Sequence, residues 1–279
     1  MRKTYIYVVL IIMVVCLLAF TGCKNNNEPS KTTNLNKITN IESSSEKTNT
    51  NNESNINKFD YKSAAEKQMA MPENGEKIAI IKIKNFGEIK VKFFENVAPK
   101  AVENFTTHAQ NGYYNGLTFH RVINEFMIQG GDPTGTGTGG ESIWGKGFGT
   151  ELSKELVPYR GSLCMAMSSQ PNSIGSQFFI TQANYNQDME KMLKLYYPNA
   201  YPEELLEQYK KYGGYLSLYQ NYTVFGQVYE GLDVLDKVAK VQTETIPLII
   251  DGTIYGEQAD KPVEDVMIEK IEITTYNAN

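Results

Sequence analysis

Residue types that often carry chemistry are scarce in this chain of 279 residues, which has two histidines, three cysteines and one tryptophan. Cys16 lies within an apolar run and Cys23 directly follows that run, which leaves Cys164 as the single thiol beyond them. An intrachain disulfide framework is therefore excluded there, and stability must come from a hydrophobic core. His108, His120 and Cys164 are too few and too scattered for a tetrahedral zinc site, so we expect no metal.

Basic residues are fewer than acidic ones: the chain has 27 Lys and Arg and 32 Asp and Glu, which gives a net charge of −5. Residues 1–58 carry a net charge of +3, so residues 59–279 carry −8. Nucleic-acid binding needs basic residues that neutralise phosphates, and we expect no nucleic-acid partner. The glycine run at 130–149 lacks the Lys-Ser/Thr ending of a phosphate loop and is interpreted as a turn-rich loop. No cofactor is expected.

The first 22 residues have the order of an export signal, because Arg2 and Lys3 precede an uncharged apolar run at 5–20. Sixteen residues are short for a transmembrane helix, which needs about 20. Phe20-Thr21-Gly22-Cys23 resembles a bacterial lipobox, in which the cysteine is lipidated and becomes the new first residue. We predict a lipoprotein signal peptide over 1–22 and lipidation, including palmitate, at Cys23; an uncleaved anchor is the alternative. Either arrangement predicts attachment to the extracytoplasmic face of the cell membrane.

Residues 24–58 contain 21 Asn, Ser or Thr in 35 positions and few sizeable apolar groups. Such a segment cannot bury enough surface to repay the entropy of ordering. We predict a disordered tether over 23–58 and a folded domain over 59–279.

The folded part is predicted to be mainly β, because short apolar and β-branched runs recur along it. The predicted strands cover residues 78–84, 88–94, 117–122, 126–129, 163–167, 177–181, 223–228 and 266–274. One amphipathic helix is expected from Pro99 to the stop signal at Asn111-Gly112, and a second over 232–241. Many short strands with two helices favour a closed or nearly closed barrel.

Residues 183–216 interrupt this rhythm, and helices are predicted there over 189–197 and 203–212. Pro202 sits at a first-turn position, and Gly213 follows the last turn. We interpret the segment as a helical insertion. Its tyrosine-rich surface either packs on the barrel or binds a partner, and the sequence leaves both alternatives open.

Three blocks carry the functional information. Residues 119–132 read FHRVINEFMIQGGD, residues 161–167 and 172–181 read GSLCMAM and NSIGSQFFIT, and residues 222–228 read YTVFGQV. These blocks, in this order, resemble the cyclophilin family of peptidyl-prolyl isomerases. The resemblance covers roughly residues 69–279. It implies a closed eight-stranded antiparallel barrel with two capping helices, and catalysis that needs no cofactor or metal.

The resemblance also assigns side chains to an active groove. The implied catalytic residues are Arg121 and Gln129, and the implied substrate-binding residues are Phe126, Met127, Ala166, Gln177, Phe179, Leu218 and Tyr222. Rotation about an X-Pro bond has a barrier of about 18–20 kcal/mol because the amide is conjugated. The proline nitrogen becomes a hydrogen-bond acceptor as conjugation is lost, so a guanidinium aimed at it favours the twisted state. By periodicity alone, the arginine would be a solvated residue and the aromatic residues would belong to the core.

Three positions depart from the family pattern. Two lie near the third block: Ser217 stands where the family often has Trp, and Tyr222 where it often has His. Tyr222 still offers an aromatic wall and a hydroxyl donor. Ser217 lacks the indole donor and its apolar face, which predicts weak cyclosporin binding. Met167 stands where the family commonly has Asn.

Two functions follow from these observations. In the first, the chain is a membrane-tethered, monomeric isomerase that assists the folding of exported proteins through their proline-containing segments. In the second, it is a non-catalytic proline-binding or scaffold lipoprotein that uses the insertion as its working surface.

Overall fold

The computed structural model describes residues 59–250 and 253–278. The predicted signal peptide 1–22, the lipidation site Cys23 and the predicted tether 24–58 lie outside the described residues. From Phe59 onward the chain forms one compact unit. A search of the described helices for one that is both long and apolar enough to cross a membrane finds none.

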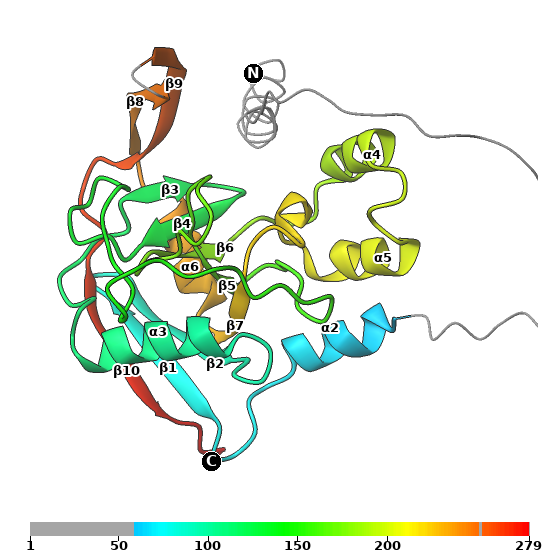
Figure 1. Ribbon diagram of the computed structural model, residues 1–279, viewed down its shortest axis with the longest axis horizontal. Coiled ribbons are helices and arrows are strands. Elements are labelled where there is room, and N and C mark those ends of the chain that lie inside the picture. Colours follow the sequence, from blue (N-terminus) through cyan, green and yellow to red (C-terminus); the bar gives the residue numbers. More distant parts are fainter. Residues whose placement is uncertain (1–58, 251–252, 279) are drawn as a thin grey trace, which may run out of the picture. The chain divides into compact units, whose positions relative to one another are not determined.

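Eight antiparallel strands form one sheet, and each overlaps one of the eight predicted strands, which confirms a mainly β fold. The strands are β1 (Lys77–Ile83), β2 (Gly87–Phe93), β3 (Arg121–Ile123), β4 (Met127–Gly130), β5 (Ser162–Met165), β6 (Phe178–Thr181), β7 (Val224–Glu230) and β10 (Ile268–Thr275). Their order in the sheet is β10-β1-β2-β7-β5-β6-β4-β3. The sheet curls around the core (Figure 1).

The prediction of a closed barrel requires a correction, because β3 and β10 are the two ends of the described sheet and no strand ladder joins them. The seam between them holds an isolated bridge from Thr118 to Met267. Backbone hydrogen bonds from Phe119 N to Val266 O and from Ile268 N to Leu117 O also span it. These contacts come just before β3 and at the start of β10. The paired stretch is therefore too short to complete a ladder, and the sheet is a half-barrel.

Two helices cover the sheet, as predicted: α3 (Pro99–Gln110) and α6 (Leu232–Ala239). The predicted apolar stripe of α3 is buried, and Phe105 at its centre has no exposed surface. The ring of Phe105 lies 5.1 Å from that of Phe178 and 5.4 Å from that of Phe225. Aromatic residues from a helix and from two strands thus meet in the core, which fixes the helix on the sheet.

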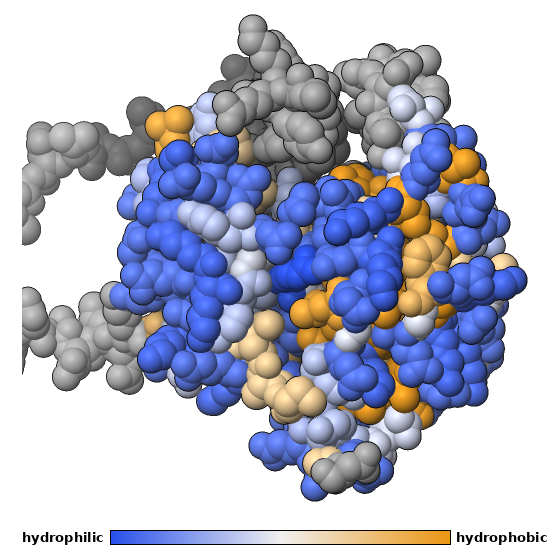
Figure 2. Space-filling model, turned by 180° about the vertical axis from the view of Figure 1, so that it is seen from behind, coloured by the Kyte–Doolittle hydropathy of each residue, from blue (hydrophilic) through white to orange (hydrophobic). Residues whose placement is uncertain are grey.

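The segment predicted as an insertion holds two helices, α4 (Gln187–Tyr196) and α5 (Glu203–Tyr212), followed by the 3₁₀ turn η2 (Leu216–Leu218). They lie to one side of the sheet, above a further helix, α2 (Tyr61–Met69) (Figure 1). The face in Figure 2 is mostly hydrophilic, and its hydrophobic residues gather mainly away from α4 and α5.

Helix α2 was not predicted, and its Gln68 shows how it is fixed. The buried amide of Gln68 donates to Val157 O at 2.7 Å and to Gln227 Oε1 at 3.1 Å, and it accepts from Val157 N at 2.9 Å. These bonds connect the helix to β7 and to the loop before β5. Tertiary contacts, more than sequence periodicity, therefore define this helix.

A two-stranded hairpin, formed by β8 (Thr243–Ile250) and β9 (Thr253–Pro262), was also not predicted. It projects from the end of the sheet opposite α4 and α5 (Figure 1). The Asp-Gly dipeptide at 251–252 is a common hairpin signal and could have revealed it. The base of this hairpin lies beside β3, which carries Arg121.

Candidate active site

Arg121 lies on β3 at one end of the sheet, where its Cα pairs with that of Gln129 on β4. Its Nε donates to Asp260 Oδ2 at 2.8 Å, and its Nη1 donates to Gln129 Oε1 at 3.5 Å. The Arg121 side chain retains 32% exposure, whereas that of Asp260 retains 3%. The guanidinium is thus held on one side by a buried carboxylate and still lines an open cavity.

Two glutamine amides continue from the arginine in a directed chain. Gln129 Nε2 donates to Gln177 Oε1 at 2.9 Å, and Gln177 Nε2 donates to the carbonyl oxygens of Gly139 at 2.8 Å and Gly137 at 3.1 Å. Carbonyl oxygens only accept, so they fix the orientation of the Gln177 amide, which in turn fixes that of Gln129. Gln129 therefore presents its oxygen to Arg121.

The apolar wall of the site comes from strands β4 and β6, from the β3–β4 turn, from the residue after β5 and from η2. Phe126, Met127, Phe179, Leu218 and Ala166 are each less than a tenth exposed. The sheet register places Phe179 between Gln129 and Cys164 on the neighbouring strands. The Tyr222 ring meets that of Phe179 edge-on at 5.5 Å. Aromatic and aliphatic side chains thus lie next to the hydrogen-bonded series of Arg121, Gln129 and Gln177.

These side chains line one open cavity of about 870 Å³. Eight of the nine residues predicted for the groove contribute to its lining: Arg121, Phe126, Met127, Gln129, Ala166, Phe179, Leu218 and Tyr222. Gln177 does not line it, and instead lies behind Gln129 and orients that amide. Met167 also lines the cavity, whereas Ser217 does not. The structure therefore gathers the predicted groove in one place.

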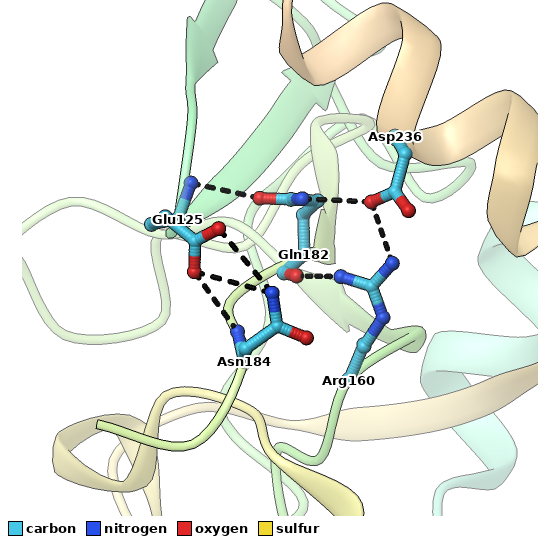
Figure 3. Close-up of polar contacts among 5 residues, drawn as sticks. All are labelled: Glu125, Arg160, Gln182, Asn184 and Asp236. Carbon is cyan, nitrogen blue, oxygen red and sulfur yellow. Dashed lines mark hydrogen bonds and ion pairs between the residues drawn. The ribbon is translucent and has the colours of Figure 1, made fainter. Parts of the chain in front are cut away.

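A polar network supports the turn that carries Phe126 (Figure 3). Glu125, with a positive φ of 60°, donates its backbone N–H to Gln182 Oε1 at 2.8 Å. Gln182 Nε2 donates to Asp236 Oδ1 at 2.8 Å, and Arg160 Nη2 donates to the same oxygen at 2.5 Å. Burial opposes the Asp236 charge, but the bonds from Arg160 and Gln182 outweigh it and lower the pKa of Asp236. The turn is thereby tied to α6.

The base of the α4–α5 segment supports Phe126 as well. The backbone N–H groups of Gln182 and Ala183 both donate to Phe126 O, at 2.8 and 3.3 Å. The Tyr215 ring lies 4.2 Å from the Phe126 ring. Gly214, at φ 111°, passes so close to Pro158 that a Cβ there would lie 2.2 Å from its carbonyl oxygen. This close approach brings Tyr215 onto Phe126.

The sequence did not point to three further parts of the cavity lining. Asp260 on β9 and His120 beside Arg121 both line it, and the loop at 133–137 forms another wall. Burial lowers the pKa of His120, which favours its neutral imidazole. Asp132 anchors the loop by accepting from Thr134 N, Gly137 N and Gly139 N. The GDPTGTGTGG run was the available signal for this wall.

Two residues that the sequence analysis considered for chemistry, Cys164 and His108, lie outside the cavity lining. Cys164 on β5 is fully buried, and burial raises the pKa of its thiol, so it is held as an inert core residue. His108 on α3 lies 3.0 Å from Glu141 O through its Nε2 and is 8% exposed. Neither residue belongs to the cavity lining.

Comparisons with known proteins agree on the class that this fold and cavity define. The family model described as cyclophilin type peptidyl-prolyl cis-trans isomerase matches residues 78–273. A Staphylococcus saprophyticus protein named "Putative peptidyl-prolyl cis-trans isomerase" is 48% identical over 200 residues, which cover 72% of this chain and 93% of the relative. A Staphylococcus aureus protein of the same name is 45% identical over 196 residues, which cover 70% of this chain and 91% of the relative.

Solved structures give the same class. A crystal structure of a Cryptosporidium parvum cyclophilin type peptidyl-prolyl cis-trans isomerase is 30% identical, with a TM-score of 0.54, and covers 73% of this chain and 99% of its own. A second structure of that protein, determined in the presence of the dipeptide Ala-Pro, is 31% identical with a TM-score of 0.53 and covers 72% and 99%. The chain belongs to the cyclophilin-type peptidyl-prolyl cis-trans isomerases, and it is an enzyme of that activity.

Proposed function

We propose that Arg121 is the group that accelerates rotation of the X-Pro bond. The observation that carries this proposal is the placement of its guanidinium beside an apolar wall, with Nε held by Asp260. The nitrogen of a twisted proline amide has recovered its lone pair and accepts a hydrogen bond, whereas the planar amide nitrogen does not. A donor held at that position stabilises the transition state more than the ground state.

The apolar wall has a separate role in this proposal. Phe126, Met127, Phe179 and Leu218 bury the proline ring, and the Tyr222 ring closes one side through its contact with Phe179. Twisting weakens the charge separation of the amide, so a site that excludes water favours the twisted state. Gln129 holds the substrate backbone on one side of the bond while the other side rotates.

The test is exchange NMR on an Ala-Pro peptide, with the full chain purified in detergent. Uncatalysed isomerisation takes about 10–100 s. Catalytic amounts of the protein are expected to bring exchange between the cis and trans proline signals into the range of seconds or faster. A folded protein that leaves the exchange rate unchanged would contradict the proposal.

Replacing Gln129 with alanine is expected to lower kcat/KM about three- to tenfold. The bonds lost to Gln177 and to the substrate backbone are neutral, and such a bond contributes about 0.5–1.5 kcal/mol; the bond from Arg121 Nη1 is charged but long, at 3.5 Å. The same exchange measurement checks this result. Gln220→Ala serves as a control, because that exposed glutamine donates to Ser153 O and does not line the cavity; an equal loss in both variants would rule out a specific role for Gln129.

We also propose that the enzyme acts on exported proteins while anchored by lipid at Cys23, on the outer face of the membrane. The export-type order of residues 1–22 and the polar composition of 24–58 support this proposal. Cells fed labelled palmitate are expected to label the parent chain and not Cys23→Ala. Protease added to intact protoplasts is expected to degrade the parent domain, and a protected domain would argue against export.

Weak cyclosporin binding remains a prediction, based on Ser217 in place of the family's tryptophan. Ser217 lies in η2, one residue before Leu218 of the cavity wall. Ser217→Trp restores a large apolar face and an indole donor, and is expected to tighten cyclosporin binding at least about tenfold, as one hydrogen bond with added contact implies. Titration calorimetry measures both affinities; a submicromolar dissociation constant for the parent would refute the prediction.

The scaffold function is supported by one observation, the exposed apolar end of α4. Leu195, Tyr196 and Tyr197 are 74%, 64% and 39% exposed. If this end binds a partner, Leu195→Ser with Tyr196→Ser abolishes copurification of a crosslinked partner and leaves isomerase activity intact. Met71→Ser, at a residue 54% exposed outside this segment, is the matched control.

The expectation that the chain is a monomer is tested by sedimentation of the purified chain.

A further inference from the structure

We infer that Asp260, on the hairpin β8–β9, is a positioning residue that sets the direction of the Arg121 guanidinium toward the proline. This inference rests on the proposed catalytic role of Arg121. The two residues are 139 positions apart in the chain and are joined by the 2.8 Å bond from Nε to Oδ2.

Arg121 needs such support because of its place in the sheet. Strand β3 has three residues and pairs with β4 at one end of the described sheet. An arginine side chain has many rotamers, and a strand at the end of a sheet has no neighbouring strand to restrict them. The carboxylate of Asp260 occupies that open side, and its 3% exposure protects the ion pair from competition by water.

The bonding pattern leaves a defined edge of the guanidinium for substrate. The group is planar and its five N–H donors point in fixed directions. Asp260 engages Nε from one side, and Gln129 Oε1 lies 3.5 Å from Nη1. Two anchors on a planar group determine its orientation, so the remaining Nη hydrogens are directed to the cavity that both residues line.

The hairpin presents Asp260 through an irregularity in its pairing. Glu244 pairs with Lys261 and Thr245 pairs with Ala259, so Asp260 is the extra residue of a β-bulge. Bulges redirect a side chain out of the regular alternation of a strand, and they occur next to active sites for that reason. The exposed ion pair from Lys261 to Glu244, at 2.8 Å, lies across the same hairpin, and Glu244→Gln removes it without removing a partner of Arg121.

The experiment compares Asp260→Ala, Asp260→Asn, Arg121→Ala and the double variant Asp260→Ala/Arg121→Ala in the full chain, with Glu244→Gln as the control. Exchange NMR with increasing peptide separates kcat from KM. Asp260→Ala is expected to lower kcat about tenfold with KM nearly unchanged, because one charged hydrogen bond in the transition state is weakened. Asp260→Asn keeps an oxygen acceptor and is expected to retain several times more activity than Asp260→Ala.

The double variant tests whether Asp260 acts through the arginine. In the Arg121→Ala background, Asp260→Ala is expected to change kcat by less than about twofold, because coupled residues are not additive. The Arg121 Nε–H resonance is expected to be protected from solvent exchange in the parent and in Glu244→Gln, and to lose that protection in Asp260→Ala. Thermal unfolding of each variant separates these effects from loss of fold.

Each outcome has a distinct meaning. Equal losses from Asp260→Ala in both backgrounds, or full activity of Asp260→Ala beside an impaired Arg121→Ala, would overturn the positioning role and leave the catalytic role of Arg121 standing. A parent that does not accelerate exchange, or an Arg121→Ala variant as active as the parent, would overturn the proposed function, and with it this inference.

Discussion

Replacing Arg121 with alanine is expected to lower the rate of catalysed X-Pro exchange about ten- to hundredfold. The donated bond is charge-assisted and is worth about 1.5–3 kcal/mol, and about 1.4 kcal/mol corresponds to a factor of ten in rate. The apolar wall stays in place, so part of the acceleration should remain. Peptide affinity should change less than kcat, since the bond forms mainly in the transition state.

The control for this variant is Lys90→Ala, which also removes one positive charge from an acidic domain. Lys90 lies on β2 and pairs with Glu230 at 2.8 Å, away from the cavity. Exchange NMR at the same salt concentration measures the catalysed exchange rate of Lys90→Ala and of Arg121→Ala. If Lys90→Ala loses as much activity as Arg121→Ala, the effect comes from net charge and the assigned role of the guanidinium is wrong.

Replacing Arg160 with alanine is expected to lower the free energy of unfolding by about 2–3 kcal/mol. Breaking a fully buried ion pair costs about 3–5 kcal/mol, and the value here is smaller because Asp236 retains 35% exposure beside the 15% of Arg160. The variant leaves the Asp236 carboxylate with Gln182 as its remaining side-chain donor in this network. Urea unfolding followed by circular dichroism measures the change.

The same variant has an expected pH dependence. The folded-state pKa of Asp236 lies below its ordinary value of 3.8, with Arg160 as one cause. A lowered pKa contributes stability that is present above 3.8 and is lost as the pH falls through the folded-state pKa. The stability difference between parent and Arg160→Ala should therefore narrow below about pH 4.

The control for Arg160→Ala is Lys237→Ala, on the same helix as Asp236. Lys237 pairs with Asp233 at 2.9 Å, and both side chains are more than 60% exposed. Such exposed pairs contribute little to stability, because water and salt screen them. A loss in Lys237→Ala comparable to that in Arg160→Ala would mean that general destabilisation of α6, rather than the network beneath Phe126, explains the result.

The regular elements were predictable because their signals are local. All eight sheet strands overlap β-rich runs, and α5 has the predicted bounds from Glu203 to Tyr212. Proline at the start fixes φ, and glycine after the end permits the positive φ that stops the helix, here 68° at Gly213. The residues of the cavity were found for another reason, since three ordered sequence blocks resemble a family whose site is known.

Helix α2 was missed because its stability is not local; the hairpin β8–β9 carries a local signal, Asp-Gly at 251–252, but its contact with Arg121 is not local. Gln68 fixes α2 through partners 89 to 159 positions away. Asp260 is similarly remote from Arg121 along the chain. No period or spacing within a short window encodes such contacts, and they exist only once the sheet has brought the segments together.

The amino-acid sequence by itself determined the eight strands of the sheet, the two covering helices, the family and eight of the nine residues predicted for the groove. Tertiary structure decided that the sheet ends at β3 and β10, that Gln177 orients Gln129 from behind, and that Asp260 holds the guanidinium of Arg121. The physical reason is the range of the interactions. Backbone preference and hydrophobic periodicity act over a few residues, whereas hydrogen bonds between side chains depend on positions that folding alone brings within 3 Å.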